Sequence, residues 1–383
     1  MIHWIIKEDT AMSSSLLEHF SALIDPRQGW KVVYPLPEIL LTVLCATMAG
    51  ADDFVEIALW GKTKIEFLRR FLPFSNGIPS HDTLNDVLNA LPGEEFSDCF
   101  ISWVESLREL DSDIVAIDGK ASRRAHNRAS GQHMLHTVSA WACQQRLVLG
   151  QEVCAEKSNE ITAIPALLKR LELTGALVTI DAMGCQTKIA QVIREKNADY
   201  LLGLKGNWPL LHKEVEVFFD NEDRQAMQQY ETVDGDHGRI EIRRHTVTHD
   251  VQWLMTDTGF PGEWKFKDLA MLAMVENITE RNGKTCSERR FYLSSALLSA
   301  QQFAGAVRAH WGIENRLHWV MDVVYRDDMM RLRTDYGPAN MVVVRHFALN
   351  IVRNINEKGS LKCKRKKLAW DDDFLFRALT ATR

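Results

Sequence analysis

The spacing of apolar and polar positions predicts a helical region in the N-terminal part of the chain. Residues 13 to about 110 carry apolar side chains at helical spacing. One such helix is expected to begin after Ser80, a residue type that caps helix N-termini. Its apolar positions are Leu84, Val87, Leu88 and Leu91. We therefore expect a helical N-terminal domain over residues 1–110.

From Asp113 onward the pattern changes to short apolar runs that are typical of strands. Three runs follow one another at residues 114–118, 136–143 and 147–154. Helical patterns at 161–173 and 186–196 then alternate with strand-like runs at 176–181 and 199–207. A strand meander followed by strand–helix alternation predicts a mixed α/β sheet with helices on its faces.

The stretch from about 221 to 290 alternates polar and apolar residues, and we expect it to be a β-rich insertion. A last strand is expected at 290–296, and helices resume at about residue 299. A single domain, residues 111–383, would then carry the sheet, the insertion and a basic C-terminal segment.

One of these late helices has an acidic face beside a normal apolar stripe. In residues 310–322, Glu314, His318 and Asp322 follow one another at four-residue steps and share a face. The apolar stripe consists of Ile313, Leu317, Val320 and Val324. This helix therefore keeps a carboxylate at the edge of its buried face.

Composition places the chain among ordinary globular proteins. It has 383 residues, 46% hydrophobic and 25% charged, enough for two or three domains. Its seven cysteines are scattered without a CxxC motif, which favours reduced thiols over disulfides or a zinc site. No apolar run is long enough to span a bilayer and no signal peptide is evident, so we expect a cytoplasmic protein with no membrane contact.

Charge is unevenly distributed. The net charge of −5 argues against indiscriminate nucleic-acid binding but permits a local basic groove. No acidic residue occurs between Gly119 and Gln151, and a second basic cluster covers residues 362–367. The first cluster contains Lys120, Arg123, Arg124, Arg128 and Arg146. Each cluster alone is equally consistent with a solvated face.

Two aspartates end strand-like runs in the same way. Asp118 follows residues 114–117 and Asp181 follows residues 177–180, and a glycine comes soon after each. Ligand chemistry in α/β sheets gathers where strands end in loops, so the two carboxylates could converge. Converging carboxylates repel one another unless a cation neutralises them. Oxygen-only ligands suit Mg²⁺ or Mn²⁺, and two such ions could catalyse phosphodiester chemistry. Glu314 would supply the third carboxylate.

These residues also have simpler interpretations. An aspartate before a glycine is common as a turn or helix-capping residue, and the polar face with Glu314 could be solvated. A zinc site would need more His or Cys than this constellation offers. The residues alone make a metal-dependent phosphoryl-transfer enzyme plausible and no more.

Several longer stretches resemble the H-repeat-associated proteins, which are bacterial insertion-sequence DDE transposases with an RNase H-like core. The matching stretches are VAIDGK (115–120), EKSNEITAIPALL (156–168), TIDAMGCQ (179–186), DYLLGLKGN (199–207) and the pattern RxHWxIENxLHWxxDV (308–323). In the N-terminal region, DPRQGW (25–30), residues 34–38 and GIPSHDT (77–83) resemble the helical domain associated with that group. The resemblance covers nearly the whole chain, in order.

The resemblance implies a fold, a site and an activity. The fold would be an RNase H-like mixed sheet with flanking helices, interrupted by an insertion before its last catalytic helix. Asp118, Asp181 and Glu314 would be the catalytic triad and hold Mg²⁺ or Mn²⁺ as two ions. The DNA-binding residues implied are Lys120, Arg123, Arg124, Lys205, Arg308 and Arg316. Asn315 and His318 would support the metal-bearing glutamate or the DNA.

The chain departs from the broader family pattern around Glu314. Relatives carry an arginine four residues before this glutamate and a lysine seven after it, where this chain has His310 and Met321. Arg308 and Arg316 would be the substitutes. Ala121 followed by Ser122 replaces the threonine that commonly follows the DGK motif. We expect Trp311 and Trp319 to be packing residues rather than residues that stack on bases.

Three functions remain open from the sequence. The leading hypothesis is a DNA transposase that cleaves the ends of its own element and transfers the strands, acting as a homodimer associated with the nucleoid. One alternative is a stand-alone RNase H-like nuclease. The other is a DNA-binding remnant that no longer transposes. The intact acidic triad argues against decay of the chemistry but does not show that terminal repeats survive.

Overall fold

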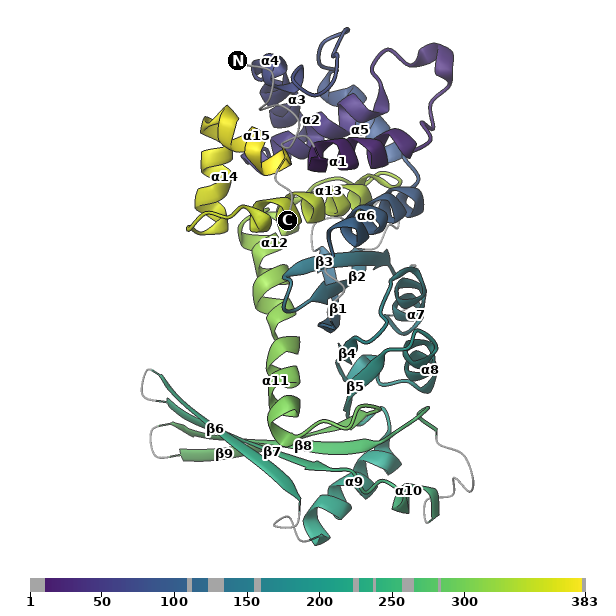
Figure 1. Cartoon of the computed structure of the whole chain (residues 1–383), viewed down its shortest axis with the longest axis vertical. Coiled ribbons are helices and arrows are strands. Elements are labelled where there is room, and N and C mark those ends of the chain that lie inside the picture. The colour runs from purple at the N-terminus through teal and green to yellow at the C-terminus, as the bar shows by residue number, and fades with distance from the viewer. Residues whose placement is uncertain are drawn as a thin grey trace, which may run out of the picture.

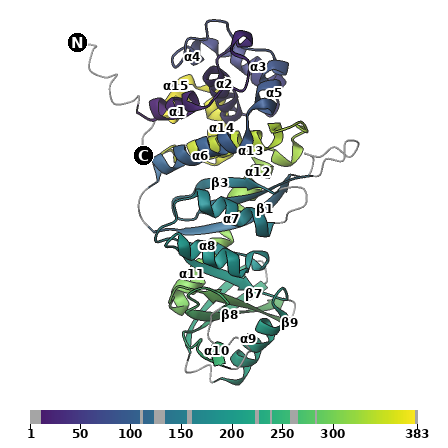
Figure 2. The same cartoon turned by 90° about the vertical axis from the view of Figure 1, so that its right-hand side faces the viewer.

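The computed structural model describes residues 11–108, 112–122, 134–154, 160–222, 227–236, 239–256, 265–281 and 284–380. Arg123, Arg124 and Arg128 lie outside the described residues. The molecule is elongated, with helices at one end, a sheet in the middle and a long-stranded extension at the other end (Figure 1). Figure 2 shows the same succession from the side.

The N-terminal helices are α1 (Ala11–Ala22), α2 (Leu36–Ala49), α3 (Phe54–Thr63), α4 (Ile65–Leu68), α5 (His81–Ala90) and α6 (Gly93–Leu107). As expected, Ser80 caps α5, because its hydroxyl accepts a hydrogen bond from the Thr83 amide. Helix α2 ends at Gly50, whose φ of 107° favours glycine. The residues that were predicted to be helical therefore form helices with ordinary start and stop signals.

The C-terminal helices pack against the N-terminal ones. They are α13 (Gly337–Asn354), α14 (Leu361–Trp370) and α15 (Asp372–Thr380). Helix α13 contacts α2, α5 and α6, and α14 contacts α2, so both chain ends contribute to one helical layer (Figure 1). The basic cluster at 362–367 is only partly a solvated face, because Lys364 and Arg365 are buried. Their side chains donate to the carbonyls of Ile355 and Thr47.

The strands form one mixed sheet of nine in the order β3-β2-β1-β4-β5-β9-β8-β7-β6. The first five are β1 (Ile114–Ser122), β2 (Leu135–Ala142), β3 (Leu147–Val153), β4 (Leu177–Ile180) and β5 (Asp199–Leu204). Strands β1, β4 and β5 run parallel to one another, β2 runs antiparallel to β1, and β3 runs antiparallel to β2. Helices α7 (Glu160–Arg170) and α8 (Thr187–Glu195) cover one face (Figure 1).

The β-rich stretch extends this same sheet. Its strands are β6 (Gln228–Asp236), β7 (Arg239–Thr248), β8 (Met271–Arg281) and β9 (Lys284–Ser294), accompanied by α9 (Pro209–Asn221) and α10 (Trp253–Thr256). Strand β9 pairs antiparallel with β5, from Leu201 opposite Ser294 to Leu204 opposite Phe291. The strand predicted at 290–296 is therefore the end of a longer strand that joins the insertion to the core.

Helix α11 (Ala300–His310) crosses from the extension back over the core sheet. It contacts β6 and β7 at one end and β1 and β4 at the other, opposite the face covered by α7 and α8 (Figure 1). Among the described residues, none of the helices is both long and apolar enough to cross a membrane.

Candidate active site

Strand register places Asp118 and Asp181 side by side. Strands β1 and β4 are parallel neighbours in which Ile117 lies opposite Ile180, so each aspartate is the next residue on its own strand. Asp118 does not end its strand, because β1 continues to Ser122 through pairing with β2. Asp181 does end β4, and its carboxylate accepts hydrogen bonds from the Met183 and Gly184 amides as a helix cap.

Glu314 reaches the same region from a modified helix. Helix α11 starts with a capping box formed by Ser299 and Gln302, and the chain continues through a π-helical turn, Glu314–His318, into α12 (Trp319–Val323). The Trp319 amide donates to the Glu314 carbonyl, five residues back. Such π-turns are rare and occur frequently at functional sites.

The three predicted carboxylates line one cavity of about 170 Å³. Asp118 comes from β1, Asp181 from the end of β4 and Glu314 from the helix that crosses above them. The remaining lining includes Thr179, Lys205, Arg290, Tyr292, His310 and Trp311. Residues separated by nearly two hundred positions in the sequence thus meet where the parallel pairing of β1 and β4 ends.

Asp118 has the strongest electrostatic perturbation in this cavity. Burial raises its pKa from 3.8 to about 7, and the charges of Asp181, Glu160 and Glu314 contribute in the same direction. A hydrogen bond from the Gly119 amide, 2.9 Å long, opposes the increase. The carboxylates are close enough for each to disfavour the ionisation of Asp118.

Glu160 is a fourth carboxylate that the sequence did not single out. It is the first residue of α7, it is buried, and its Oε1 lies 3.0 Å from His136 Nε2 on β2. A Cβ atom added to Gly119 would lie 2.1 Å from Glu160 Oε1, so glycine leaves the space that this carboxylate fills. Burial raises the pKa of Glu160; His136 opposes the increase, and Asp181 adds to it. Glu160 comes near Asp118 through the arrangement of strands and helices in the fold, not through proximity in the sequence.

The two histidines near Glu314 have different partners. His310 Nδ1 lies 3.0 Å from Thr179 Oγ1 in the wall of the cavity, and burial lowers its pKa. Burial therefore favours the neutral form of this imidazole. His318 Nδ1 lies 3.4 Å from Asp118 Oδ2, so it faces the first aspartate of the triad. Burial also lowers the pKa of His318, to about 4.

Lys120 is not among the described residues that line the catalytic cavity. Its Nζ lies 2.6 Å from Asp322 Oδ1 and 3.0 Å from Asp327 Oδ2, and the side chain is only 12% exposed. Burial would lower the pKa of Lys120, but the charge of Asp327 and the hydrogen bond to Asp322 raise it overall. A DNA phosphate would have to compete with these aspartates for the ammonium group.

The other predicted DNA-binding residues are distributed over two openings. Lys205 is exposed at the mouth of the catalytic cavity. Arg308, Arg316 and Asn315 line a larger groove of about 1110 Å³ between α11 and strands β6 to β9. Asn315 also donates to the Trp311 carbonyl.

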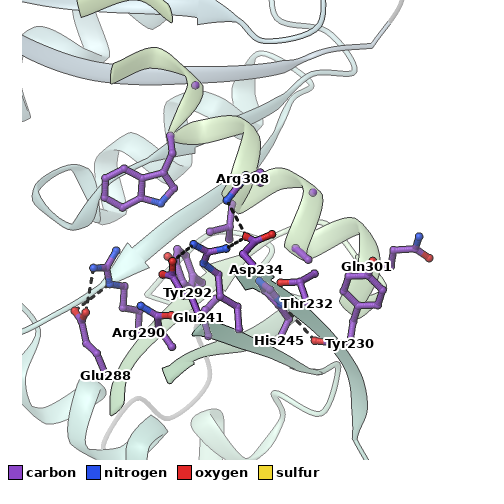
Figure 3. Close-up of a pocket in the computed structure, with 18 of the residues that line it drawn as sticks. Tyr230, Thr232, Asp234, Glu241, His245, Glu288, Arg290, Tyr292, Gln301 and Arg308 are labelled. Carbon is purple, nitrogen blue, oxygen red and sulfur yellow. Dashed lines mark hydrogen bonds and ion pairs between the residues drawn. The ribbon is translucent and has the colours of Figure 1, made fainter. Parts of the chain in front are cut away.

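The groove mixes basic, acidic and aromatic side chains. Figure 3 shows Arg308 descending from α11 toward Asp234, 3.8 Å away, while Arg290 pairs with Glu288 on the opposite side. Tyr230, His245 and Tyr292 lie on its strand-formed floor. Arg290, Tyr292, Val307 and Trp311 line both openings, so the groove adjoins the catalytic cavity.

Trp311 and Trp319 are both exposed, and their assignment as packing residues stays a prediction. Trp311 is 40% exposed and Trp319 is 57% exposed. The Arg290 guanidinium lies 5.4 Å from the centre of the Trp311 ring, which forms part of the wall between groove and cavity. Helical periodicity identified the buried stripe correctly, with Ile313, Leu317 and Val320 inside, but both indoles lie beside it.

The donor chemistry of the cavity fits a hard divalent cation, because Asp118, Asp181 and Glu314 offer only carboxylate oxygens. The like charges that raise the pKa of Asp118 would be relieved by such a cation. Within the described ranges, however, no three His, Cys, Asp or Glu side chains are already arranged to hold a metal ion. Oxygens of Asp118 and Asp181 are instead engaged by backbone amides.

Comparison with known proteins identifies two consecutive family matches. Residues 17–104 match the family described as DDE_Tnp_1-associated, and residues 103–351 match the Transposase DDE domain. The H repeat-associated putative transposase YhhI of Escherichia coli (strain K12) is 38% identical over 373 residues, covering 96% of this chain and 98% of the relative. The putative transposase YncI of Escherichia coli O157:H7 is 37% identical over 374 residues, covering 96% and 95%.

A solved structure of a piggyBac transposase synaptic complex with hairpin DNA aligns with a TM-score of 0.44 and 11% identity, covering 96% of this chain and 78% of that one. The family match and the strand topology confirm the predicted fold class, an RNase H-like mixed sheet with a helical N-terminal region. The resemblance to H-repeat-associated proteins is confirmed as well.

Proposed function

The chain belongs to the Transposase DDE domain family, and from this membership we propose that it cleaves DNA at the ends of an insertion sequence and transfers the cut strands. The observation that carries the proposal is the meeting of Asp118, Asp181 and Glu314 in one cavity. These are the residues that the family resemblance assigns to the catalytic triad.

In this proposal, Asp118, Asp181 and Glu314 hold Mg²⁺ or Mn²⁺, as two ions. Bound metal would supply activation of the attacking oxygen and stabilisation of the leaving oxygen. The chain itself positions the triad, through the parallel register of β1 and β4 and through the helix that presents Glu314. His318 orients Asp118 through its contact with Oδ2.

DNA would approach along the side where the cavity and the groove open. Lys205, Arg308 and Arg316 are among the described basic residues that line these openings, and we assign them to phosphate contacts. Arg123 and Arg124 keep the same predicted role. A homodimer is proposed because two element ends must be processed together.

The test uses duplexes that carry the gene's own flanking sequences, incubated with the purified chain and Mg²⁺. Wild-type protein is expected to cleave at the element end, whereas Asp118→Asn and Glu314→Gln should reduce cleavage to background while remaining folded. Equal cleavage of unrelated duplexes would instead support the stand-alone nuclease. Tight binding without cleavage of any duplex would support the DNA-binding remnant.

A further inference from the structure

Three consecutive side chains on one face of β1 contact the helical segment that carries Glu314. Alternate residues of a strand share a face, so Asp118, Lys120 and Ser122 point the same way. His318 lies 3.4 Å from Asp118, Asp322 lies 2.6 Å from Lys120, and Asp327 Oδ2 accepts a hydrogen bond from Ser122, 3.0 Å long. We name these three contacts the β1 ladder.

The first two rungs of the β1 ladder match in spacing. Two residues of a strand advance about 6.7 Å, and four residues of a helix advance about 6 Å. Asp118 and Lys120 therefore meet His318 and Asp322 in step. Ser122 meets Asp327, which lies five residues after Asp322 and beyond the end of α12 at Val323. If the helical segment shifted by one helical turn relative to β1, all three contacts would be lost together.

Lys120 is the central rung and belongs to a buried charge network. Its ammonium contacts Asp327 at 3.0 Å in addition to Asp322. Asp327 is buried, and its other oxygen lies 2.5 Å from Arg345 on α13. The far end of the helical segment is thereby fixed to the strand and to the C-terminal helix at the same time.

From this geometry we propose that Lys120 is a positioning residue that sets the register of the Glu314 helix on β1. The proposal rests on the function proposed above, since the distance it controls is that between Asp118 and Glu314. It replaces a phosphate contact as the role of Lys120. The π-turn at Glu314–His318 ends at His318, which forms the first rung, so the ladder holds the helix on the side where its hydrogen bonding is irregular.

The experiment compares Lys120→Met with wild type for cleavage, for DNA affinity and for the salt dependence of that affinity. Duplexes with the gene's flanking sequence serve as the probe. Cleavage is expected to fall about 100-fold, because ångström-scale misplacement of reacting groups has effects of that size. DNA affinity and its salt slope should stay unchanged, and Lys120→Arg should restore part of the cleavage.

Two other lysines provide comparisons. Lys205→Met, at the cavity mouth, should show the opposite pattern, with weaker binding and a salt slope reduced by about 0.9 for one lost phosphate contact. Lys169→Met, exposed on α7 across the sheet, should change neither quantity. If Lys120→Met does not fold, Asp322→Ala removes the contact between Lys120 and Asp322 from the more exposed side and should give the same result, reduced cleavage with unchanged DNA affinity.

The proposal is overturned if Lys120→Met cleaves normally, or if its loss of cleavage comes with weaker, less salt-dependent DNA binding. Hydrogen exchange tests the β1 ladder without using cleavage. Failure of this proposal can therefore be distinguished from failure of the proposed function. Exchange of amides 314–323 should accelerate in Lys120→Met but not in Lys169→Met, whether or not wild-type protein cleaves DNA. Unchanged exchange there would also reject the ladder.

Discussion

At the scale of single residues, local motifs identified the three carboxylates but not their surroundings. Asp118 and Asp181 follow recognisable strands, and Glu314 lies in a distinctive helix. Glu160 and His136 meet at 3.0 Å only because β2 and α7 both lie beside β1, which no local pattern encodes. The same is true of Lys120, whose neighbours Asp322 and Asp327 are about two hundred residues away. The sequence shows which residues are basic, but it does not show which side chains they contact in the folded protein.

The raised pKa of Asp118 predicts how the stability of the metal-free protein depends on pH. The pKa of Asp118 is about 7 in the folded protein and near 3.8 in the unfolded chain, so the folded state binds a proton more tightly. Its contribution to the free energy of unfolding therefore decreases as pH rises from about 4 to about 7. Asp118→Asn should remove this decrease and stabilise the metal-free protein at pH 8 by a few kcal/mol at most, on the order expected for such a shift.

Urea unfolding in a metal chelator at pH 5 and pH 8 measures this effect. The difference between Asp118→Asn and wild type should be larger at pH 8 than at pH 5. Asp86→Asn, which neutralises an exposed aspartate on α5, serves as the control and should show no such difference. Equal stability of Asp118→Asn and wild type at both pH values would contradict the prediction.

At the scale of elements, periodicity predicted the kinds of strand and helix better than their extent or partners. The insertion was expected as a separate β-rich stretch, yet β9 hydrogen-bonds to β5 and continues the core sheet. Alternation reveals a strand but not its neighbour, since pairing between distant segments depends on the whole fold. The π-turn at Glu314–His318 could also not be predicted from a helical wheel, because a helical wheel assumes 100° per residue throughout.

Phe303 is the residue that most directly joins α11 to the insertion. It is fully buried, with its ring centre 5.2 Å from that of Tyr292 on β9 and 5.8 Å from that of His245 on β7. Phe303→Ala should reduce the opening free energy of β7 and β9 by about 3–5 kcal/mol, because it leaves a cavity in a packed cluster. Native-state hydrogen exchange of amides in these strands measures that free energy.

The matched change is Leu297→Ala, which truncates a side chain that is 67% exposed just before α11. It should alter the same exchange rates by no more than about 0.5 kcal/mol in free energy. If Phe303→Ala behaved like Leu297→Ala, α11 would be held to the insertion by other contacts. Reduced cleavage in Phe303→Ala would additionally connect this packing to the placement of Glu314.

At the scale of the whole molecule, the sequence did not predict that the chain closes on itself. The family matches cover residues 17–104 and 103–351. The C-terminal helices return to pack on the N-terminal ones, with Asn340 on α13 donating to the Leu88 and Leu91 carbonyls. Neither composition nor charge predicts that the C-terminal helices pack on the N-terminal ones.

The proposed function requires two catalytic sites acting together, because one chain has one cavity that contains the three carboxylates. We expect a homodimer, or a dimer formed on DNA, with the N-terminal helices binding the element ends. The net charge of −5 disfavours tight nonspecific association, so sequence-specific contacts must select those ends. Phosphate contacts should still make binding weaken steeply as salt increases.

Sizing complexes of the protein with labelled duplexes in Ca²⁺, without cleavage, tests this assembly. Duplexes with the gene's flanking repeats should give complexes that contain two protein chains and two duplexes, and scrambled duplexes of equal length should not. Mixing two duplexes with different fluorophores distinguishes a true pair from a single duplex bound by two chains, because only the pair carries both colours. Single-duplex complexes at every protein concentration would contradict the paired arrangement, and with it the coordinated joining of two ends, while leaving cleavage of one end by Asp118, Asp181 and Glu314 intact.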